Sequence, residues 1–258
     1  MTHRVWLVAG SVALAIGLAG RAEAQSAPVF VDVDCDAGQT IGDALAKTAD
    51  EPHVVLSISG ICRESVEIRR DDVELQGQPG AAIWADASQK YALYVNRGRR
   101  IMASGLTLQG GYQAALLVVY GDFSGSRLTI AGASIGVRLQ NGANVTLADA
   151  AVEGNTHGVL VDDSMISLSF CTIYKNRAYG IWAQHARASL YNVEVFDNTT
   201  GVAGDGISLV STAGQYVRIH DNQLGVRLRL NSVGMHGGVP PTVSHNATDF
   251  DLDASSIW

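Results

Sequence analysis

An asparagine recurs in this sequence about every twenty-two residues, and this recurrence restricts the fold more than any other feature. Successive members are 21, 22, 24 and 24 residues apart: Asn155, Asn176, Asn198, Asn222 and Asn246. An apolar position keeps step with them at intervals of 22, 22, 21 and 24 residues: Val137, Val159, Ile181, Val202 and Val226. A fixed period in this range is typical of stacked supersecondary units, so the sequence predicts a solenoid.

Each repeat contains three short stretches of alternating or apolar residues, separated by turn residues. In the clearest repeat these stretches are residues 136–140, 145–147 and 151–152, and Asn141-Gly142 marks the first turn. Three short strands in about twenty-two residues are typical of one coil of a parallel β-helix. We therefore predict an all-β fold, a parallel β-helix of seven to nine coils.

The third strand of each coil should contribute one column of inward residues. We assign to it Val73-x-Leu75, Leu106-x-Leu108 and Leu128-x-Ile130, followed by Val152, Ile173, Val195, Ile219 and Val243. The gap of 33 residues between Leu75 and Leu108 then implies an insertion, which we place at residues 78–89. The asparagines come just after this strand, at a tight bend. There an amide can bond both to backbone and to the equivalent amide of the next coil, which predicts a structural asparagine ladder.

The ends of a solenoid must be covered, because open strand edges pair with other chains. Residues 40–49 are predicted to form a short N-terminal capping helix. Thr40 precedes Asp43 by three residues, and Ile41, Ala44, Leu45 and Thr48 share one face. At the other end, residues 249–253 alternate, with Phe250 and Leu252 predicted to point inward and the aspartates outward.

The first 24 residues have the features of a secretory signal peptide. Arg4 precedes an apolar run, residues 5–20, and Ala22-Glu23-Ala24 is a small-x-small cleavage site. We predict that residues 1–24 are a signal peptide and that residues 25–258 form one β-helix domain, with the cap and first coil in residues 25–60. No later segment is continuously apolar, so we expect no membrane span after cleavage and a secreted or periplasmic location.

The composition limits the partners and cofactors. The formal charge of −7 becomes −8 when Arg4, Arg21 and Glu23 are removed, and Lys and Arg are not clustered, which argues against a nucleic-acid partner.

Cys35 and Cys62 flank the first structured segment, and disulfides persist in exported proteins, so we predict a bond between them. Cys171 is left as a small buried residue. No metal-ligand spacing is present, so we expect no metal or cofactor; calcium has no supporting motif.

Three segments resemble the N-terminal coils of bacterial right-handed parallel β-helix proteins of the pectate-lyase-like superfamily. They are Val31 to Ile41, Ile58 to Glu64 and Asp71 to Gly77. The resemblance covers nearly the whole mature chain and implies a right-handed helix. Many members are polysaccharide lyases, hydrolases or epimerases, and others have no assigned activity. Of the polygalacturonase signatures only Asp162-Asp163 matches; Gly-His-Gly and Arg-Ile-Lys are missing, as is the Asp-Pro-His-Asp stretch of the alginate epimerases.

Outward residues of one strand column form a continuous stripe, because equivalent positions stack about 4.8 Å apart. The first outward column is Tyr94, Leu117, Arg138, Leu160, Trp182, Ala203 and Arg227; the second is Asn96, Val119, Gln140, Asp162, Gln184, Asp205 and Arg229. An exposed tryptophan among arginine, glutamine and aspartate is typical of a sugar-binding groove. We predict a polysaccharide partner, bound by Tyr94, Arg138, Trp182, Gln184 and Arg227. A plain solvated sheet face is the alternative.

Two aspartates in the second column provide the candidate catalytic pair. Asp162 and Asp205 are two coils apart, about 9.5 Å along the axis, at the upper edge of the range for inverting hydrolysis. Lyase chemistry would instead need a base near Arg138 or His185 and a cation on the uronate carboxylate. Neither constellation is complete. The sequence therefore leaves open an enzyme, a polysaccharide-binding protein, and a non-catalytic structural or adhesion-type envelope scaffold.

Overall fold

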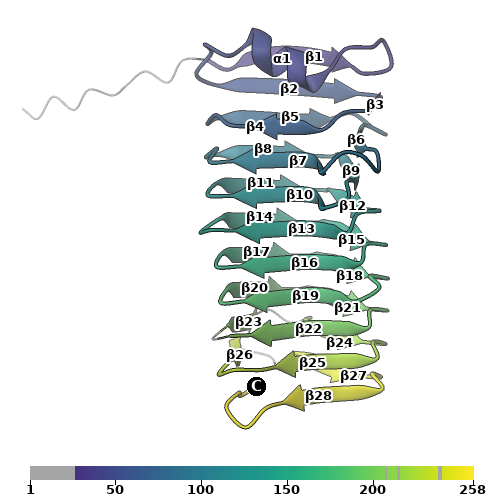
Figure 1. The fold of residues 1–258 in the computed structure, drawn as a ribbon, viewed down its shortest axis with the longest axis vertical. Coiled ribbons are helices and arrows are strands. Elements are labelled where there is room, and N and C mark those ends of the chain that lie inside the picture. Colours follow the sequence, from purple (N-terminus) through teal and green to yellow (C-terminus); the bar gives the residue numbers. More distant parts are fainter. Residues whose placement is uncertain (1–26, 207, 214–215, 238–239) are drawn as a thin grey trace, which may run out of the picture.

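The molecule is a stack of coils formed by three parallel sheets that run along one axis (Figure 1). The computed structural model describes residues 27–206, 208–213, 216–237 and 240–258. The predicted signal peptide, residues 1–24, lies outside the described residues. Each strand pairs in parallel with the equivalent strand of the next coil, as shown for Ile166 with Ala188 and for Val159 with Ile181. The predicted parallel β-helix is confirmed. The longest sheet has ten strands, one more than the upper limit of seven to nine coils expected from the repeat.

The first sheet, sheet A, has ten strands. In spatial order they are β1 (Val29–Asp34), β2 (Val54–Ser59), β5 (Val73–Gly77), β8 (Ile101–Ser104), β11 (Asp122–Ser126), β14 (Asn144–Ala148), β17 (Met165–Ser169), β20 (Arg187–Tyr191), β23 (Leu209–Ala213) and β26 (Val233–Gly237).

Sheets B and C have nine strands each. Sheet B contains β3 (Ile61–Cys62), β6 (Ala82–Ala85), β9 (Thr107–Gly110), β12 (Thr129–Ala131), β15 (Ala151–Glu153), β18 (Thr172–Tyr174), β21 (Glu194–Phe196), β24 (Arg218–His220) and β27 (Thr242–Ser244). Sheet C contains β4 (Val66–Ile68), β7 (Tyr91–Asn96), β10 (Ala114–Val119), β13 (Ile135–Gln140), β16 (His157–Asp162), β19 (Tyr179–Gln184), β22 (Thr200–Asp205), β25 (Leu224–Leu228) and β28 (Thr248–Leu252).

A single hydrophobic core runs along the inside of the three sheets. The apolar column that follows the repeat is fully buried and in register from coil to coil: Val137, Val159, Ile181, Val202 and Val226. Stacking the same inward position in successive coils lets β-branched side chains fill the interior layer by layer, which is why a two-residue alternation within a twenty-two-residue period produces this fold.

The predicted insertion at residues 78–89 is present, but it is shorter than the gap of 33 residues implies, because Leu75 does not belong to the third-strand column. The chain from Leu75 to Leu93 spans 18 residues, against 12 from Leu147 to Val159, the equivalent residues three coils further on. Leu75 lies on β5 of sheet A and pairs with Ala103, whereas Leu108 lies on β9 of sheet B and pairs with Ile83. Ile83 is therefore the missing member, and Cys62 precedes it. With these two residues the spacing from Ile83 to Leu108 is 25, close to that of the other coils.

The five repeating asparagines form a hydrogen-bonded ladder at the bend between sheets B and C. Asn155, Asn176, Asn198 and Asn222 are buried, and Asn246 is partly buried. In each of the four steps the Oδ1 atom of one asparagine accepts from the backbone N–H and the Nδ2 of the asparagine one coil earlier, at 2.9 to 3.2 Å. Each Nδ2 also donates to a backbone carbonyl, so the side chains replace the strand hydrogen bonds that are missing at the bend.

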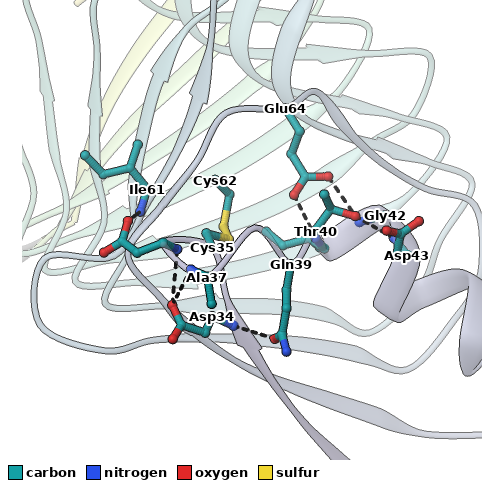
Figure 2. The surroundings of a disulfide bond; sticks show 12 residues. Asp34, Cys35, Ala37, Gln39, Thr40, Gly42, Asp43, Ile61, Cys62 and Glu64 are labelled. Atoms are coloured by element: carbon teal, nitrogen blue, oxygen red, sulfur yellow. Dashed lines mark hydrogen bonds between the residues drawn. A yellow bond between two sulfur atoms is a disulfide. The ribbon is translucent and has the colours of Figure 1, made fainter.

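A short helix, α1 (Ile41–Lys47), covers the N-terminal end of the core (Figure 1). The Oγ1 atom of Thr40 accepts from the backbone N–H of Asp43 at 3.0 Å, as the sequence predicts. The carboxylate of Glu64 provides a second cap that was not predicted, since it accepts from the N–H groups of Ile41 at 2.7 Å and Gly42 at 3.1 Å (Figure 2). An acidic side chain at this position also complements the helix dipole.

The predicted disulfide joins Cys35 to Cys62, whose Cα atoms are 5.0 Å apart (Figure 2). Beside it, the Oδ1 atom of Asp36 accepts from the backbone N–H of Ile61 at 3.2 Å. The bond therefore joins the segment before the capping helix to the next coil. Cys171 is a buried free thiol, as expected, and burial raises its pKa.

The last strand keeps the predicted register, but its apolar side chains are not covered. Phe250 pairs with Val226 and Leu252 with Leu228, which places both on the inward side. They are nevertheless 42% and 40% exposed, because β28 is the terminal strand of its sheet. Trp258 packs against the core near Phe250, with ring centroids 5.9 Å apart.

Within the described part of the chain, no helix has the length and apolar character needed to cross a bilayer.

Candidate functional site

The predicted site residues lie on the outer face of sheet C. The strand register reproduces the first column as Tyr94, Leu117, Arg138, Leu160, Trp182, Ala203 and Arg227. In the second column, Asp162 pairs with Gln184 and Gln184 with Asp205. Stacked strands are about 4.8 Å apart, so Tyr94 lies about 29 Å from the position of Arg227 along the axis. Tyr94 and Arg227 therefore lie at opposite ends of the column, whereas Tyr94 is two strands from Arg138.

Tyr94 belongs to an apolar patch in the middle of this face. A second hydrophobic cluster, separate from the core, consists of Ala114, Leu117, Ile135 and Leu160, with Tyr91, Tyr94, Val119 and Trp182 packed against it. The rings of Tyr91 and Tyr94 are 4.7 Å apart. Because burying apolar surface removes it from water, this cluster stabilises the outer face without contributing to the interior core.

Trp182 lies at one edge of that patch, within an aromatic group. Its ring centroid is 4.7 Å from that of Tyr179 and 5.8 Å from that of His157, and the last two rings stack at 5.5 Å. The indole is half-buried rather than fully exposed as expected from the sequence. Trp182 therefore supports its neighbours while presenting part of its ring to solvent.

The sequence reasoning missed Tyr179 and His157, and the reason lies in the bend. Strict alternation places Tyr179, three residues before Trp182, on the opposite side of the strand. The chain turns at the asparagine ladder, however, and Gly180 sits there so tightly that a Cβ atom would lie 2.6 Å from the carbonyl oxygen of Gly201. An aromatic residue directly before this repeated glycine was the available signal.

Asp205 orients Trp182 and neutralises Arg227. Its Oδ2 atom accepts from the indole Nε1 of Trp182 at 2.6 Å and from the guanidinium of Arg227 at 3.0 Å. The same guanidinium lies 5.0 Å from the ring centroid of Tyr179, a cation–π contact. The indole thus reaches across to the next coil, beside the fully buried methyl group of Ala203. We call His157, Tyr179, Trp182, Asp205 and Arg227 the Trp182 cluster.

Three buried side-chain nitrogens on this face have no hydrogen-bond partner among the described residues. They are Nε of Arg138, Nδ1 of His157 and Nε of Arg227. Burial also lowers the pKa of His157, which favours the neutral imidazole. Unpaired buried polar atoms are costly, and in native proteins each calls for an explanation.

Of the two candidate catalytic aspartates, Asp162 has fewer hydrogen-bond partners among the described residues than Asp205. Its carboxylate lies within 4.8 Å of ligand atoms of both Asp163 and His185. Asp205, two strands away, already accepts from two donors, so the pair does not form a free acid and base. The catalytic assignment remains a prediction. Asp162 is half-buried and Asp163 and His185 are exposed, and exposed acidic groups are common without a metal ion. The expectation of no metal cofactor likewise remains a prediction.

Comparison with known proteins identifies the family. A family model described as "Right handed beta helix region" matches residues 83–224, more than half of the chain. The chain belongs to the right-handed β-helix family. A search of curated protein sequences gives no significant match.

Solved structures of other right-handed β-helix proteins have the same fold at low sequence identity. Pectin methylesterase from carrot is 14% identical with a TM-score of 0.63, and the match covers 87% of this chain and 88% of that one. Pectate lyase Pel9A is 14% identical with a TM-score of 0.57, covering 88% and 76%. An alginate lyase from Paenibacillus sp. str. FPU-7 is 9% identical with a TM-score of 0.54, covering 90% and 99%. At these identities the likeness shows the fold alone.

Proposed function

We propose that this chain is an exported polysaccharide-binding protein, and that it holds the glycan on the outer face of sheet C at the Trp182 cluster. The observation that carries the proposal is the orientation of Trp182. An aspartate of the next coil, itself bonded to an arginine one coil further on, fixes the indole, while part of the ring stays open to solvent. An ordered aromatic ring binds without losing side-chain freedom, which lowers the cost of association.

The groups around the ring suit a sugar. The apolar C–H face of a sugar packs on an aromatic ring, and planar amide and guanidinium groups pair with hydroxyls or carboxylates. Gln184 is two residues from Trp182 on β19, and Arg138 lies two coils away in the same column as Trp182. In the described part of the chain Arg138 forms no ion pair, unlike Arg227, so its charge is available to a carboxylate-bearing ligand.

Two further observations support this proposal. The pectate lyase, the pectin methylesterases and the alginate lyase that share the fold act on polysaccharides, as their names state. The signal-like residues 1–24 and the Cys35–Cys62 bond suit a secreted or periplasmic protein with one domain, residues 25–258. Binding is favoured over cleavage because the carboxylate of Asp205 already accepts hydrogen bonds from Trp182 and Arg227. A scaffold without affinity for glycans is the alternative.

The experiment is a binding series on Trp182. Polygalacturonate, pectin and alginate are titrated by calorimetry against the parent protein, Trp182→Ala and Trp182→Phe. We expect Trp182→Ala to weaken binding by about 1 kcal/mol or more, roughly fivefold, because the stacking surface is lost. Trp182→Phe keeps an aromatic ring but loses the N–H donor to Asp205, so we expect an intermediate affinity.

A matched control separates binding from folding. Tyr174 is also a half-buried, outward aromatic residue, but it lies on sheet B, where it stacks on Phe196 at 5.0 Å. Tyr174→Ala should leave affinity unchanged, and circular dichroism should show all variants folded at the assay temperature. No binding of any polymer would favour the scaffold alternative, whereas equal measurable affinities for Trp182→Ala and the parent would place the glycan away from the Trp182 cluster. Release of reducing ends or unsaturated products would show cleavage.

A further inference from the structure

A pocket on sheet B, on a different sheet from the Trp182 cluster, has the features of a second saccharide site. Its volume is about 560 Å³, within the range of roughly 300–1,000 Å³ typical of small-molecule sites. Trp84 on β6 and Gln109 on β9 are paired in register and line it, and Arg63 directly follows β3. The turn after β6 and the loops after β9 and β12 complete the wall.

A fixed cation and a fixed carboxylate line this pocket. The guanidinium of Arg63 lies 4.4 Å from the ring centroid of Trp84, and a cation–π contact of this kind holds its planar donors in place. The Oδ1 atom of Asp86 accepts from the backbone N–H of Ser88 at 2.7 Å and from its hydroxyl at 2.6 Å. These bonds lower the pKa of Asp86, so the carboxylate is ionised at neutral pH. One positive and one negative charge leave the lining with no net charge.

Tyr112 supplies an exposed ring at the edge of the pocket. It is 49% exposed, yet its backbone is fixed, because its N–H donates to the carbonyl of Gln89 at 2.9 Å. The backbone just before Tyr112 is also fixed, because it packs closely against the backbone of the preceding coil. Gly110 has a φ of +83°, and a Cβ atom there would lie 2.0 Å from the carbonyl oxygen of Ala85. The backbone that carries Tyr112 at the pocket edge is therefore fixed.

We propose that this pocket binds one neutral sugar residue, with its C–H face on Tyr112 and its hydroxyls on Asp86, Arg63 and Gln109. A carboxylate and a guanidinium each offer two atoms in a plane, which matches a pair of adjacent hydroxyls. The balanced charge disfavours a uronate, which would meet Asp86, and a basic ligand, which would meet Arg63. This site does not rest on the function proposed for sheet C.

Intrinsic fluorescence can test the pocket in isolation. A protein that begins at Gln25 and carries Trp182→Phe and Trp258→Phe keeps Trp84 as its one tryptophan. It is titrated with cellohexaose, mannohexaose and galactohexaose, and with an oligogalacturonate as the charged comparison. We expect at least one neutral hexasaccharide to shift the Trp84 emission saturably, and the oligogalacturonate to bind at least tenfold more weakly.

The Tyr112→Ala variant of this protein should bind the neutral sugar at least fivefold more weakly. Tyr191→Ala is the matched control, since Tyr191 is 46% exposed and lies on sheet A, away from the pocket. The proposal is overturned if no neutral sugar changes the emission, if the two tyrosine variants behave alike, or if the uronate binds as tightly as the neutral sugars. The emission comes from Trp84, which lies on a different sheet from the Trp182 cluster, so failure of the sheet C site cannot produce any of these results.

Discussion

Replacing Asn176 with alanine is expected to lower the free energy of unfolding by about 3 kcal/mol or more. The amide makes four hydrogen bonds inside the ladder. Its Oδ1 atom accepts from the backbone N–H and the Nδ2 of Asn155, both at 3.2 Å. Its Nδ2 donates to the carbonyl of Val152 at 3.2 Å and to Oδ1 of Asn198 at 3.0 Å. Alanine leaves these partners buried, and each unsatisfied group costs about 1–3 kcal/mol.

Two other asparagines serve as controls for this measurement. Asn246 is partly buried at the last position of the ladder, so Asn246→Ala should cost less than Asn176→Ala. Asn144 is exposed at the start of β14 and lies outside the ladder, so Asn144→Ala should change stability by less than about 0.5 kcal/mol. Urea unfolding gives all three values. If Asn176→Ala and Asn144→Ala unfold alike, the ladder does not stabilise the solenoid.

Reducing the Cys35–Cys62 bond is expected to destabilise the N-terminal end by about 3.5 kcal/mol in the chain-entropy model, since the two residues are 27 positions apart. The bond joins the capping segment to the next coil, and the cap covers the end of the core. A solenoid unfolds through neighbouring repeats, so the loss should appear first at α1 and β1. Hydrogen exchange measured with and without reductant reports protection in each segment.

The free thiol provides the control. Cys171 is buried directly before β18, five strands along sheet B from β3, and forms no disulfide, so Cys171→Ala should respond to reductant as the parent does. Exchange in β19 and β22 should stay unchanged in both proteins. Equal protection of α1 with and without reductant would contradict a stabilising role for the bond.

The fold could be predicted from sequence because the same physical requirement is repeated many times. In the C-terminal coils an inward β-branched residue and a bend asparagine recur together, so several coils show the same period. The weaker coils lack the asparagine, and there alternation alone could not distinguish sheet A from sheet B. This is why Leu75 was placed in the column that Ile83 occupies. Glu64 as a helix cap was invisible because its partners are more than twenty residues away.

The candidate site could be predicted only in part. Period-two alternation located Trp182 and Asp205 on one face, because regular strands keep that rule. It could not show that Asp205 bonds to Trp182 across a strand, since this contact depends on side-chain rotamers. Nor could it place Tyr179 with them, since the strand bends just before Gly180. The pocket beside Trp84 is lined by residues of β6 and β9 and by the segments that follow β3, β6, β9 and β12, and loops do not follow the repeat.

Fluorescence of Trp182 in the presence of a bound polysaccharide tests the central claim most directly. A protein that begins at Gln25 and carries Trp84→Phe and Trp258→Phe keeps Trp182 as its one tryptophan. For a polymer shown by calorimetry to bind, titration should change the Trp182 emission saturably, with the same Kd as the calorimetric value. Calorimetric binding with no change in Trp182 emission would place the glycan elsewhere and contradict the account.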